Sequence, residues 1–246
     1  MTQDFIVVIP ARFAAKRLPG KPLIEFGGRP LLQHVYQAAL NSKAAEVIIA
    51  TDDERIETAA RRFGARAVMT SPTHRTGTDR IAETVSLLQL PGSRIIVNVQ
   101  GDELGLPPVL IDQVAGNLAG NRDASMASLY TPVKSAQEMN NPNCVKVVVD
   151  AQGYALMFSR SALPWNAPDK GCRHIGIYAY TCDFLKTYTE LPVCELEQAE
   201  RLEQLRALHH GYRIHMAQAA AEPGPEINTP EDVKAARTSY RDKSTG

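Results

Sequence analysis

Apolar positions along the first half of the chain follow two periodicities, one typical of strands and one typical of helices. Four short segments are apolar almost throughout, as are strands of a parallel sheet covered on both faces: Phe5–Ile9, Glu46–Ala50, Ala67–Met69 and Arg94–Val99. Between these segments, apolar residues repeat at helical spacing after Pro30, after Asp52 or Asp53, and after Thr78, which we expect to start or cap helices. Such alternation predicts right-handed crossovers and an α/β fold with an open, mostly parallel sheet.

The second half has a different rhythm. Val145–Asp150 and Tyr154–Phe158 flank a turn-forming Asp-Ala-Gln-Gly segment, which predicts a hairpin, and Arg173–Thr181 predicts a further strand. A long helix is expected over Glu195–His209, and a last helix after Thr229. No internal repeat or linker divides the chain, so we predict one domain over residues 1–246 with an inserted antiparallel lobe at about 132–192.

Composition and charge narrow the functional classes. Of the 246 residues 44% are apolar and 22% are charged, and 27 basic residues balance 27 acidic ones. A chain without net positive charge is a poor candidate for general binding to nucleic acid or to anionic membranes. The sequence has no apolar run near the roughly 18 residues of a membrane span, no features of a secretory leader and no CxxC pair among four cysteines. We therefore expect a cytoplasmic protein.

The loop after the first strand carries four cations and no acidic residue. They lie within residues 11–22, at the carboxyl end of a strand, where open α/β sheets bind ligands. A cation about 4 Å from a phosphate gains on the order of 4 kcal/mol of Coulomb energy at an intermediate dielectric, before desolvation. The loop matches neither a Walker A motif nor GxGxxG. Polyphosphate binding is the favoured interpretation, and a solvated basic loop is the alternative.

Two further segments carry candidate chemistry. Asp102 follows the strand 94–99 after Gln100 and Gly101, where a carboxylate suits Mg²⁺, although aspartate also commonly caps such a turn. Gln100 can donate and accept, which suits a base edge or a substrate carboxylate. The segment 75–78 opens a helix and offers amides and hydroxyls to a nucleoside, with ordinary helix capping as the alternative.

A series of short motifs lies in order along the chain: Ile9-Pro10-Ala11-Arg12, Arg17-Leu18-Pro19-Gly20-Lys21-Pro22, Ala50-Thr51-Asp52-Asp53, Thr76-Gly77-Thr78-Asp79-Arg80, Val97-Asn98-Val99-Gln100-Gly101-Asp102-Glu103, Asn141-Pro142-Asn143, Phe158-Ser159-Arg160, Arg173-His174-Ile175-Gly176-Ile177-Tyr178, Leu202-Glu203-Gln204-Leu205-Arg206 and Thr229-Pro230-Glu231-Asp232. Taken together, these motifs resemble the CMP-Kdo synthetase (3-deoxy-manno-octulosonate cytidylyltransferase) family over nearly the whole chain. The resemblance implies a Rossmann-like nucleotidyltransferase sheet and a reaction in which the anomeric hydroxyl of Kdo attacks the α-phosphate of CTP. This reaction forms CMP-Kdo for lipopolysaccharide biosynthesis and releases diphosphate.

The resemblance also implies roles for individual residues. Arg12, Lys21 and Asp102 carry the catalytic chemistry, and the nucleotide is bound by Pro10, Ala11, Arg12, Lys16, Arg17, Lys21, Arg75, Thr76, Gly77, Thr78 and Gln100. The acidic sugar is bound by Gln100, Arg160, His174, Tyr178, Glu203 and Gln204, with Arg160 suited to pair with its carboxylate. Mg²⁺ is held by Asp102 and Asn228, and the family implies a homodimer. Taken alone, His174 is more often a hydrogen-bonded core residue.

Three departures from the family pattern lie close to this chemistry. The family has aspartate where this chain has Asn228, an uncharged ligand for which Glu226 could substitute. Leu104-Gly105-Leu106 replaces a proline and two bulky apolar residues, which we expect to loosen the turn beside Asp102, and Asn166–Cys172 is shorter than usual. Two alternatives therefore stand beside Kdo activation: a cytidylyltransferase for another anionic acceptor, such as a different sugar acid or a phosphonate, and a CTP-binding paralogue without turnover.

Overall fold

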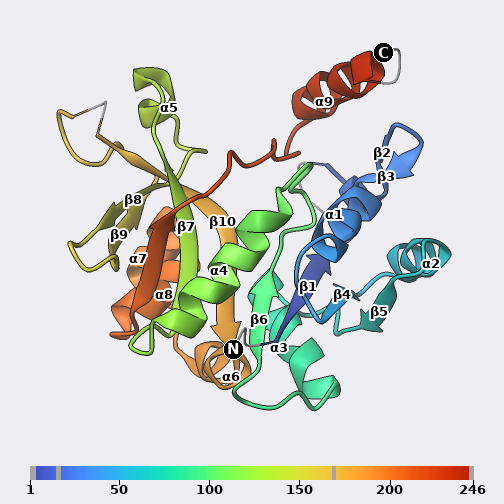
Figure 1. Cartoon of the computed structure of the whole chain (residues 1–246), viewed down its shortest axis with the longest axis horizontal. Coiled ribbons are helices and arrows are strands. Elements are labelled where there is room, and N and C mark those ends of the chain that lie inside the picture. The colour runs from blue at the N-terminus through green and yellow to red at the C-terminus, as the bar shows by residue number, and fades with distance from the viewer. Residues whose placement is uncertain (1–3, 15–17, 168–169, 244–246) are drawn as a thin grey trace.

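The computed structural model describes residues 4–14, 18–167 and 170–243, which form a twisted sheet with helices on both faces (Figure 1). The strand order of the main sheet is β11-β7-β10-β6-β1-β4-β5. These strands are β1 (Phe5–Ala11), β4 (Glu46–Thr51), β5 (Arg66–Met69), β6 (Ile95–Asn98), β7 (Met126–Pro132), β10 (Cys172–Thr181) and β11 (Ile214–Gln218). All neighbouring pairs run parallel except those of β10, which is antiparallel to β6 and β7. The predicted α/β fold with an open, mostly parallel sheet is confirmed.

Successive residues of β1 enter two different cores. Val7 and Ile9 pack in the core that includes α1 (Leu31–Leu40), α2 (Glu54–Arg62), α4 (Pro108–Gly120) and α9 (Pro230–Lys243). Ile6 and Val8 pack on the other face with α3 (Gly77–Leu87), α6 (Cys182–Glu190) and α8 (Gln204–His209). Because side chains alternate across a strand, a strand covered on both faces is apolar at every position. Within the described ranges, no helix combines the length and apolar character needed to cross a membrane.

The predicted hairpin is formed by β8 (Lys146–Val149) and β9 (Ala155–Ser159), and its turn places Gly153 at φ 85°. It follows α5 (Ala136–Asn140), and β8 pairs with the first residues of β10. β10 then continues into the main sheet, so the antiparallel strands extend directly from it. A separate two-stranded sheet, β2 (Glu25–Phe26) and β3 (Arg29–Pro30), lies near α9. The boundaries 132–192 of an inserted lobe stay a prediction.

The long helix predicted over Glu195–His209 is wrong, because the structure has two short helices there. α7 (Glu195–Glu200) ends at Arg201, whose φ of 55° is left-handed, and α8 begins at Gln204. The leucine periodicity continues through this break, since Leu202 and Leu205 are both buried. A sequence pattern of leucines therefore cannot locate the bend.

The start of α3 also differs from expectation. We expected Thr78 to cap this helix, but Thr76 does so: its hydroxyl accepts from the backbone N–H of Asp79 at 3.1 Å. The carboxylate of Asp79 accepts in return from the N–H of Thr76 at 3.2 Å, completing a capping box. Thr78 is thereby released into the first helical turn with its hydroxyl free to bond elsewhere. By contrast, Asp53 caps α2 as predicted.

Candidate active site

The loop after β1 returns on itself and brings Lys21 back beside the sheet. Gly20, at φ 72°, donates its backbone N–H to Phe13 O at 2.9 Å, and the 3-10 helix η1 (Lys21–Leu23) follows. The loop encloses what we call the loop cavity, of about 450 Å³. Its lining residues are Pro10, Ala11, Arg12, Ala14, Leu18, Lys21, Pro22, Gln100, Gly101, Asp102 and Asn228. Lys16 and Arg17, predicted as auxiliary phosphate ligands, lie outside the described residues.

Lys21 joins two residues that are far apart in the sequence. Its ammonium lies 2.6 Å from Asp102 Oδ2 and 3.4 Å from Asn228 Oδ1. Both oxygens thus face one point at the edge of the loop cavity. An oxygen pair of this kind suits Mg²⁺, which prefers carboxylate and carbonyl ligands completed by water and phosphate. No group of three or more histidine, cysteine or acidic side chains converges to hold a metal in the part of the chain that is described.

The turn that carries Asp102 is paired with the segment before α9. Leu104 N–H donates to Pro225 O at 3.2 Å and Ile227 N–H donates to Asp102 O at 3.0 Å. Leu104 is buried and Gly105 takes φ 76°. Backbone bonds on both sides of the turn hold it in place, so the loosening that we expected here is not what the structure shows.

Two carboxyl groups face each other across this pairing. Glu103 and Glu226 are bridge partners, and Glu103 is only 3% exposed. Burial, then the neighbouring Glu226 and Asp102, raise the pKa of Glu103 well above its usual range, and desolvation followed by Asp102 raises the pKa of Glu226. Burial and the neighbouring negative charges therefore both disfavour the ionised form of these two carboxyl groups.

The start of α3 lines a second, inner cavity of about 230 Å³. Its lining residues are Gly77, Thr78, Asn98, Gln100, Met126, Gly176, Tyr178, Tyr180, Tyr188, Arg201, Leu202, Glu203 and Gln204. Gln100 donates to Asn98 Oδ1 at 3.0 Å, and Asn98 donates to the Tyr180 hydroxyl at 2.9 Å. This chain of bonds orients the side chain of Gln100, and a Cβ at Gly77 would approach Pro10 Cγ to 3.2 Å, so the helix start lies close to β1.

Glu203 is tied to the start of α3 by the break between α7 and α8. Thr78 Oγ1 donates to Glu203 Oε2 at 2.9 Å, and the Tyr188 hydroxyl donates to the Glu203 backbone oxygen at 2.9 Å. Desolvation raises the pKa of this carboxyl, although the Thr78 hydrogen bond opposes the shift. The structure thus brings a predicted nucleotide ligand and a predicted sugar ligand into direct contact, and the Glu203 side chain faces Thr78 in this state.

A third cavity, the lateral cavity, has a volume of about 500 Å³. Its lining residues are Gln100, Asp102, Glu103, Asn141, Asn143, Cys144, Val145, Arg160, Arg173, His174, Gly176, Tyr178, Leu202, Gln204, Glu226, Asn228, Thr229 and Asp232. The loop cavity and the lateral cavity share Gln100, Asp102 and Asn228, and all three cavities share Gln100. Of the predicted site residues that the structure describes, all but Arg75 and Thr76 line at least one of these cavities, which meet at Gln100.

Two of the predicted sugar ligands already have partners within the protein. The Arg160 guanidinium donates to Glu200 O at 2.7 Å and to Pro142 O at 2.9 Å, so it crosslinks two walls of the lateral cavity. His174 is 8% exposed and shares a 2.9 Å hydrogen bond with Ser128. Burial, followed by the Arg173 charge, lowers the pKa of His174 to about 3. These geometries match a core role at least as well as a binding role.

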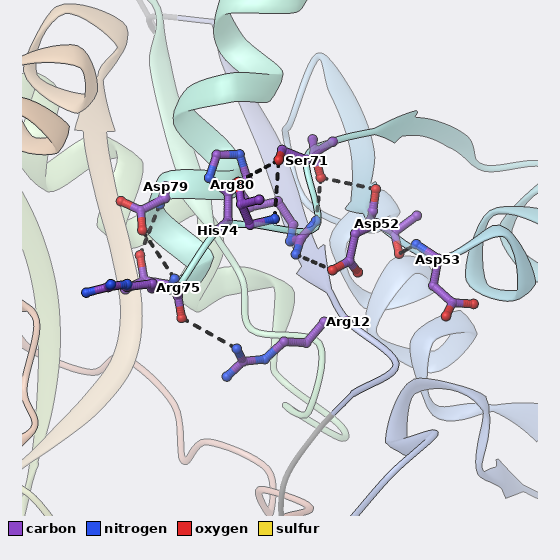
Figure 2. Close-up of polar contacts among 12 residues, drawn as sticks. Arg12, Asp52, Asp53, Ser71, His74, Arg75, Asp79 and Arg80 are labelled. Carbon is purple, nitrogen blue, oxygen red and sulfur yellow. Dashed lines mark hydrogen bonds and ion pairs between the residues drawn. The ribbon is translucent and has the colours of Figure 1, made fainter.

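Arg12 and the loop before α3 are joined across the two halves of the site. Figure 2 shows Arg12 reaching the backbone oxygen of Arg75, at 3.5 Å, while the guanidinium of Arg75 points away from it. In the same view Arg80 reaches Asp52, at 2.9 Å. Arg80 also donates to the Thr70 hydroxyl. Arg80 is 3% exposed and had no role in our sequence interpretation. Its place in the quoted Thr-Gly-Thr-Asp-Arg motif was the available signal, as was that of Asn98 beside Gln100.

The fold and site define a nucleotidyltransferase, and comparisons with known proteins make the class specific. The family model described as cytidylyltransferase matches residues 6–214, so the chain belongs to the cytidylyltransferase family and is a CTP-dependent enzyme of that kind. A curated relative from Vibrio parahaemolyticus, named 3-deoxy-manno-octulosonate cytidylyltransferase, is 50% identical over 95% of this chain and 97% of its own length. A relative of the same name from Idiomarina loihiensis is also 50% identical, with the same coverage.

A solved structure supports the same placement. The structure of CMP:2-keto-3-deoxy-manno-octonic acid synthetase complexed with CTP superimposes with a TM-score of 0.91 at 40% identity, covering 98% of this chain and 100% of that one. The predicted resemblance to the CMP-Kdo synthetases is therefore confirmed, and with it the nucleotidyltransferase fold.

Proposed function

We propose that this chain transfers the cytidylyl group of CTP to the anomeric hydroxyl of 3-deoxy-manno-octulosonate, releasing diphosphate and supplying an activated sugar acid for lipopolysaccharide biosynthesis. The observation that carries the proposal is the convergence of three cavities on Gln100, in a chain 50% identical to curated enzymes of that name. The cationic loop cavity suits the triphosphate, the inner cavity suits the nucleoside and the lateral cavity suits the acceptor.

In this proposal the loop cavity neutralises and orients the triphosphate. Arg12 and Lys21 offer separate cations in the lining of this cavity. The backbone at Gly101 lies close to β1, since a Cβ at Gly101 would lie 3.2 Å from Pro10 O. The acceptor oxygen forms a bond to the α-phosphorus while the bond to the diphosphate oxygen breaks, and the hydroxyl proton passes to solvent water. Such phosphoryl transfer depends mainly on positioning and charge stabilisation, with little covalent work for the protein.

We infer that Asp102 and Asn228 hold Mg²⁺. Their oxygens fit, because both face the point that the Lys21 ammonium occupies. The ion would neutralise phosphate charge and polarise the reacting phosphoryl oxygen. A metal there would compete with Lys21 for Asp102, which would leave the Lys21 ammonium available to the phosphates. Asn228 brings an oxygen without a charge, which weakens this pair relative to two carboxylates.

The acceptor carboxylate belongs to the lateral cavity in this proposal. Arg160 and Arg173 both line it, and Gln204, only 4% exposed, lines both it and the inner cavity. Tyr178 also lines both and packs against His174, with ring centroids 5.4 Å apart. Arg160 binds the carboxylate by exchanging one of its bonds to backbone oxygens for a bidentate pair.

Diphosphate release with CTP and Mg²⁺ tests the proposal. Turnover with Kdo supports it, and turnover only with another sugar acid or a phosphonate moves the specificity to that acceptor. Calorimetric binding of CTP without turnover on any acid in the panel would show a nucleotide-binding paralogue. Arg160→Lys is a useful companion variant, since a lysine keeps the charge but cannot make the bidentate contact. We expect it to raise the KM for the acid more than the KM for CTP.

We further propose that the protein acts as a homodimer in the cytoplasm. Leu156, on β9, is 61% exposed and Trp165 is 87% exposed, and among the described strands β9 pairs only with β8. An exposed apolar side chain on an open strand edge, together with a further exposed aromatic residue, is typical of a protein interface. Sedimentation of the wild type and of Leu156→Ser with Trp165→Ser measures this directly: a dimer that the double substitution dissociates supports the proposal, and a monomeric wild type contradicts it.

A further inference from the structure

The side-chain amide of Asn228 has a single orientation dictated by its two neighbours. Asn228 Oδ1 lies 3.4 Å from the Lys21 ammonium, and Asn228 Nδ2 donates to Glu226 Oε2 at 3.1 Å. An ammonium group can only donate and a carboxylate can only accept. Each neighbour alone therefore selects the same orientation of the amide, with its oxygen toward Lys21 and Asp102.

The backbone places Glu226 where it can do this. The segment 225–227 is extended against the Asp102 turn, with Ile227 N–H donating to Asp102 O at 3.0 Å. In an extended segment, residues two apart point to the same side, so the side chains of Glu226 and Asn228 are neighbours. On the other side of Asn228, its backbone N–H and that of Thr229 donate to Asp232 Oδ2, at 2.9 and 2.7 Å. Asn228 is thus fixed from both ends.

We propose that Glu226 is a positioning residue for the metal ligand Asn228, holding the amide nitrogen so that Oδ1 faces Asp102 and gains negative charge. A hydrogen bond from an amide N–H to a carboxylate shifts electron density toward the amide oxygen, because the two groups polarise each other. The neutral amide thereby acquires part of the charge that an aspartate would bring. Carboxylates that orient a ligand from behind typically account for 10–100-fold in metal affinity. The inference rests on the proposed Mg²⁺ site of Asp102 and Asn228.

Binding of Mn²⁺, measured by electron paramagnetic resonance with CTP present, gives a readout independent of turnover. Glu226→Gln keeps the length and the hydrogen-bond acceptor but removes the charge, and we expect it to weaken Mn²⁺ binding about tenfold. Glu222→Gln is the matched control, since Glu222 precedes the same segment and pairs only with exposed Lys134 at 2.8 Å, as far as the described contacts go. An unchanged Mn²⁺ affinity in Glu226→Gln would overturn the proposal.

In the variant Asn228→Asp, the proposal predicts a different effect of Glu226→Gln on Mn²⁺ binding. In Asn228→Asp the partner at 228 is a carboxylate with no N–H to donate, and Glu226 then faces a like charge. Adding Glu226→Gln to Asn228→Asp should therefore leave Mn²⁺ binding unchanged or tighten it, whereas the same substitution weakens binding in the wild type. Equal losses in both backgrounds would reduce Glu226 to a general electrostatic contribution and refute the positioning role.

Asp102→Asn tests the proposed Mg²⁺ site separately from the positioning role of Glu226. Mn²⁺ binding unaffected by Asp102→Asn would contradict the metal site itself. A large loss with Asp102→Asn, combined with none in Glu226→Gln, would leave the metal site standing and reject only the role of Glu226. Thermal midpoints of each variant identify any loss of Mn²⁺ binding that reflects unfolding. If Glu226→Gln unfolds, Glu226→Asp takes its place, because it keeps the charge and shortens the side chain. We expect Glu226→Asp to weaken Mn²⁺ binding, since its carboxylate no longer reaches Asn228 Nδ2.

Discussion

The guanidinium of Arg80 lies 2.9 Å from the carboxylate of Asp52, joining the first turns of α3 to the carboxyl end of β4. Arg80 also donates to the Thr70 hydroxyl, whose own hydrogen bond goes to Thr51 O at 3.1 Å. Figure 2 shows the contact between Arg80 and Asp52. The pair is buried on one side, and it fixes the helix whose first residues line the inner cavity.

Arg80→Met should destabilise the protein by about 3 kcal/mol, because removing one partner of a buried ion pair leaves the other charge uncompensated. It should also raise the KM for CTP, since the start of α3 loses its anchor. Chemical denaturation and steady-state kinetics measure the two effects. Arg66→Met is the control: Arg66 pairs with Glu46 at 2.6 Å but is 52% exposed, so its loss should change stability by less than about 1 kcal/mol. Equal losses of stability in the two variants would contradict the statement that the buried Arg80 pair contributes more than the exposed Arg66 pair.

Arg12→Ala should weaken CTP binding by about 2 kcal/mol, roughly 30-fold in Kd, as expected for the loss of a charge-assisted hydrogen bond to phosphate. Its one described protein contact is the long bond to Arg75 O, so the fold should be little affected. Isothermal titration calorimetry of CTP measures the change, with the exposed Arg29→Ala as the control. Wild-type affinity in Arg12→Ala would remove Arg12 from the phosphate site.

Lys21→Met should change metal and nucleotide binding in opposite directions. Without nucleotide, the ammonium neutralises Asp102 at 2.6 Å, so its removal should tighten Mn²⁺ binding to the free protein. CTP binding and turnover should both fall, since a cation at the triphosphate is lost. Mn²⁺ titrations with and without CTP test both statements. Weaker Mn²⁺ binding by free Lys21→Met would mean that the metal site lies away from Asp102.

The stability of the protein should fall as the pH decreases below about 6.5, in part because of His174. Burial and Arg173 lower the pKa of this residue to about 3 in the folded state, so between these values the unfolded chain binds a proton that the folded protein does not. Stability is then fully present above the unfolded pKa and decreases by up to about 1.4 kcal/mol per pH unit toward the folded pKa. His174→Gln should flatten this slope in urea denaturation experiments at pH 5 and pH 7. An unchanged slope would show that His174 titrates normally.

The positions of β1, β4 and β6 were predictable because a strand that is buried on both faces is apolar at nearly every residue. β7 and β11 were missed, since a central strand such as β7 carries the polar Ser128, which is buried and bonded to backbone oxygens of β10. The bend at Arg201 was missed for a related reason: leucine spacing continues across it, and contacts from residues distant in the sequence, such as those of Thr78 and Tyr188 with Glu203, lie beside it.

The sequence by itself determined the fold class, the cationic loop and the family, because these depend on local periodicity and on motifs that lie in order along the chain. Only the tertiary structure decided which residues meet: Lys21 with Asp102 and Asn228, and Arg80 with Asp52. Only the tertiary structure likewise shows the role proposed for Glu226, which depends on its contact with Asn228 and on its backbone pairing with the Asp102 turn. Hydrogen bonds and charges act over a few ångströms in space, and a linear sequence does not contain those distances.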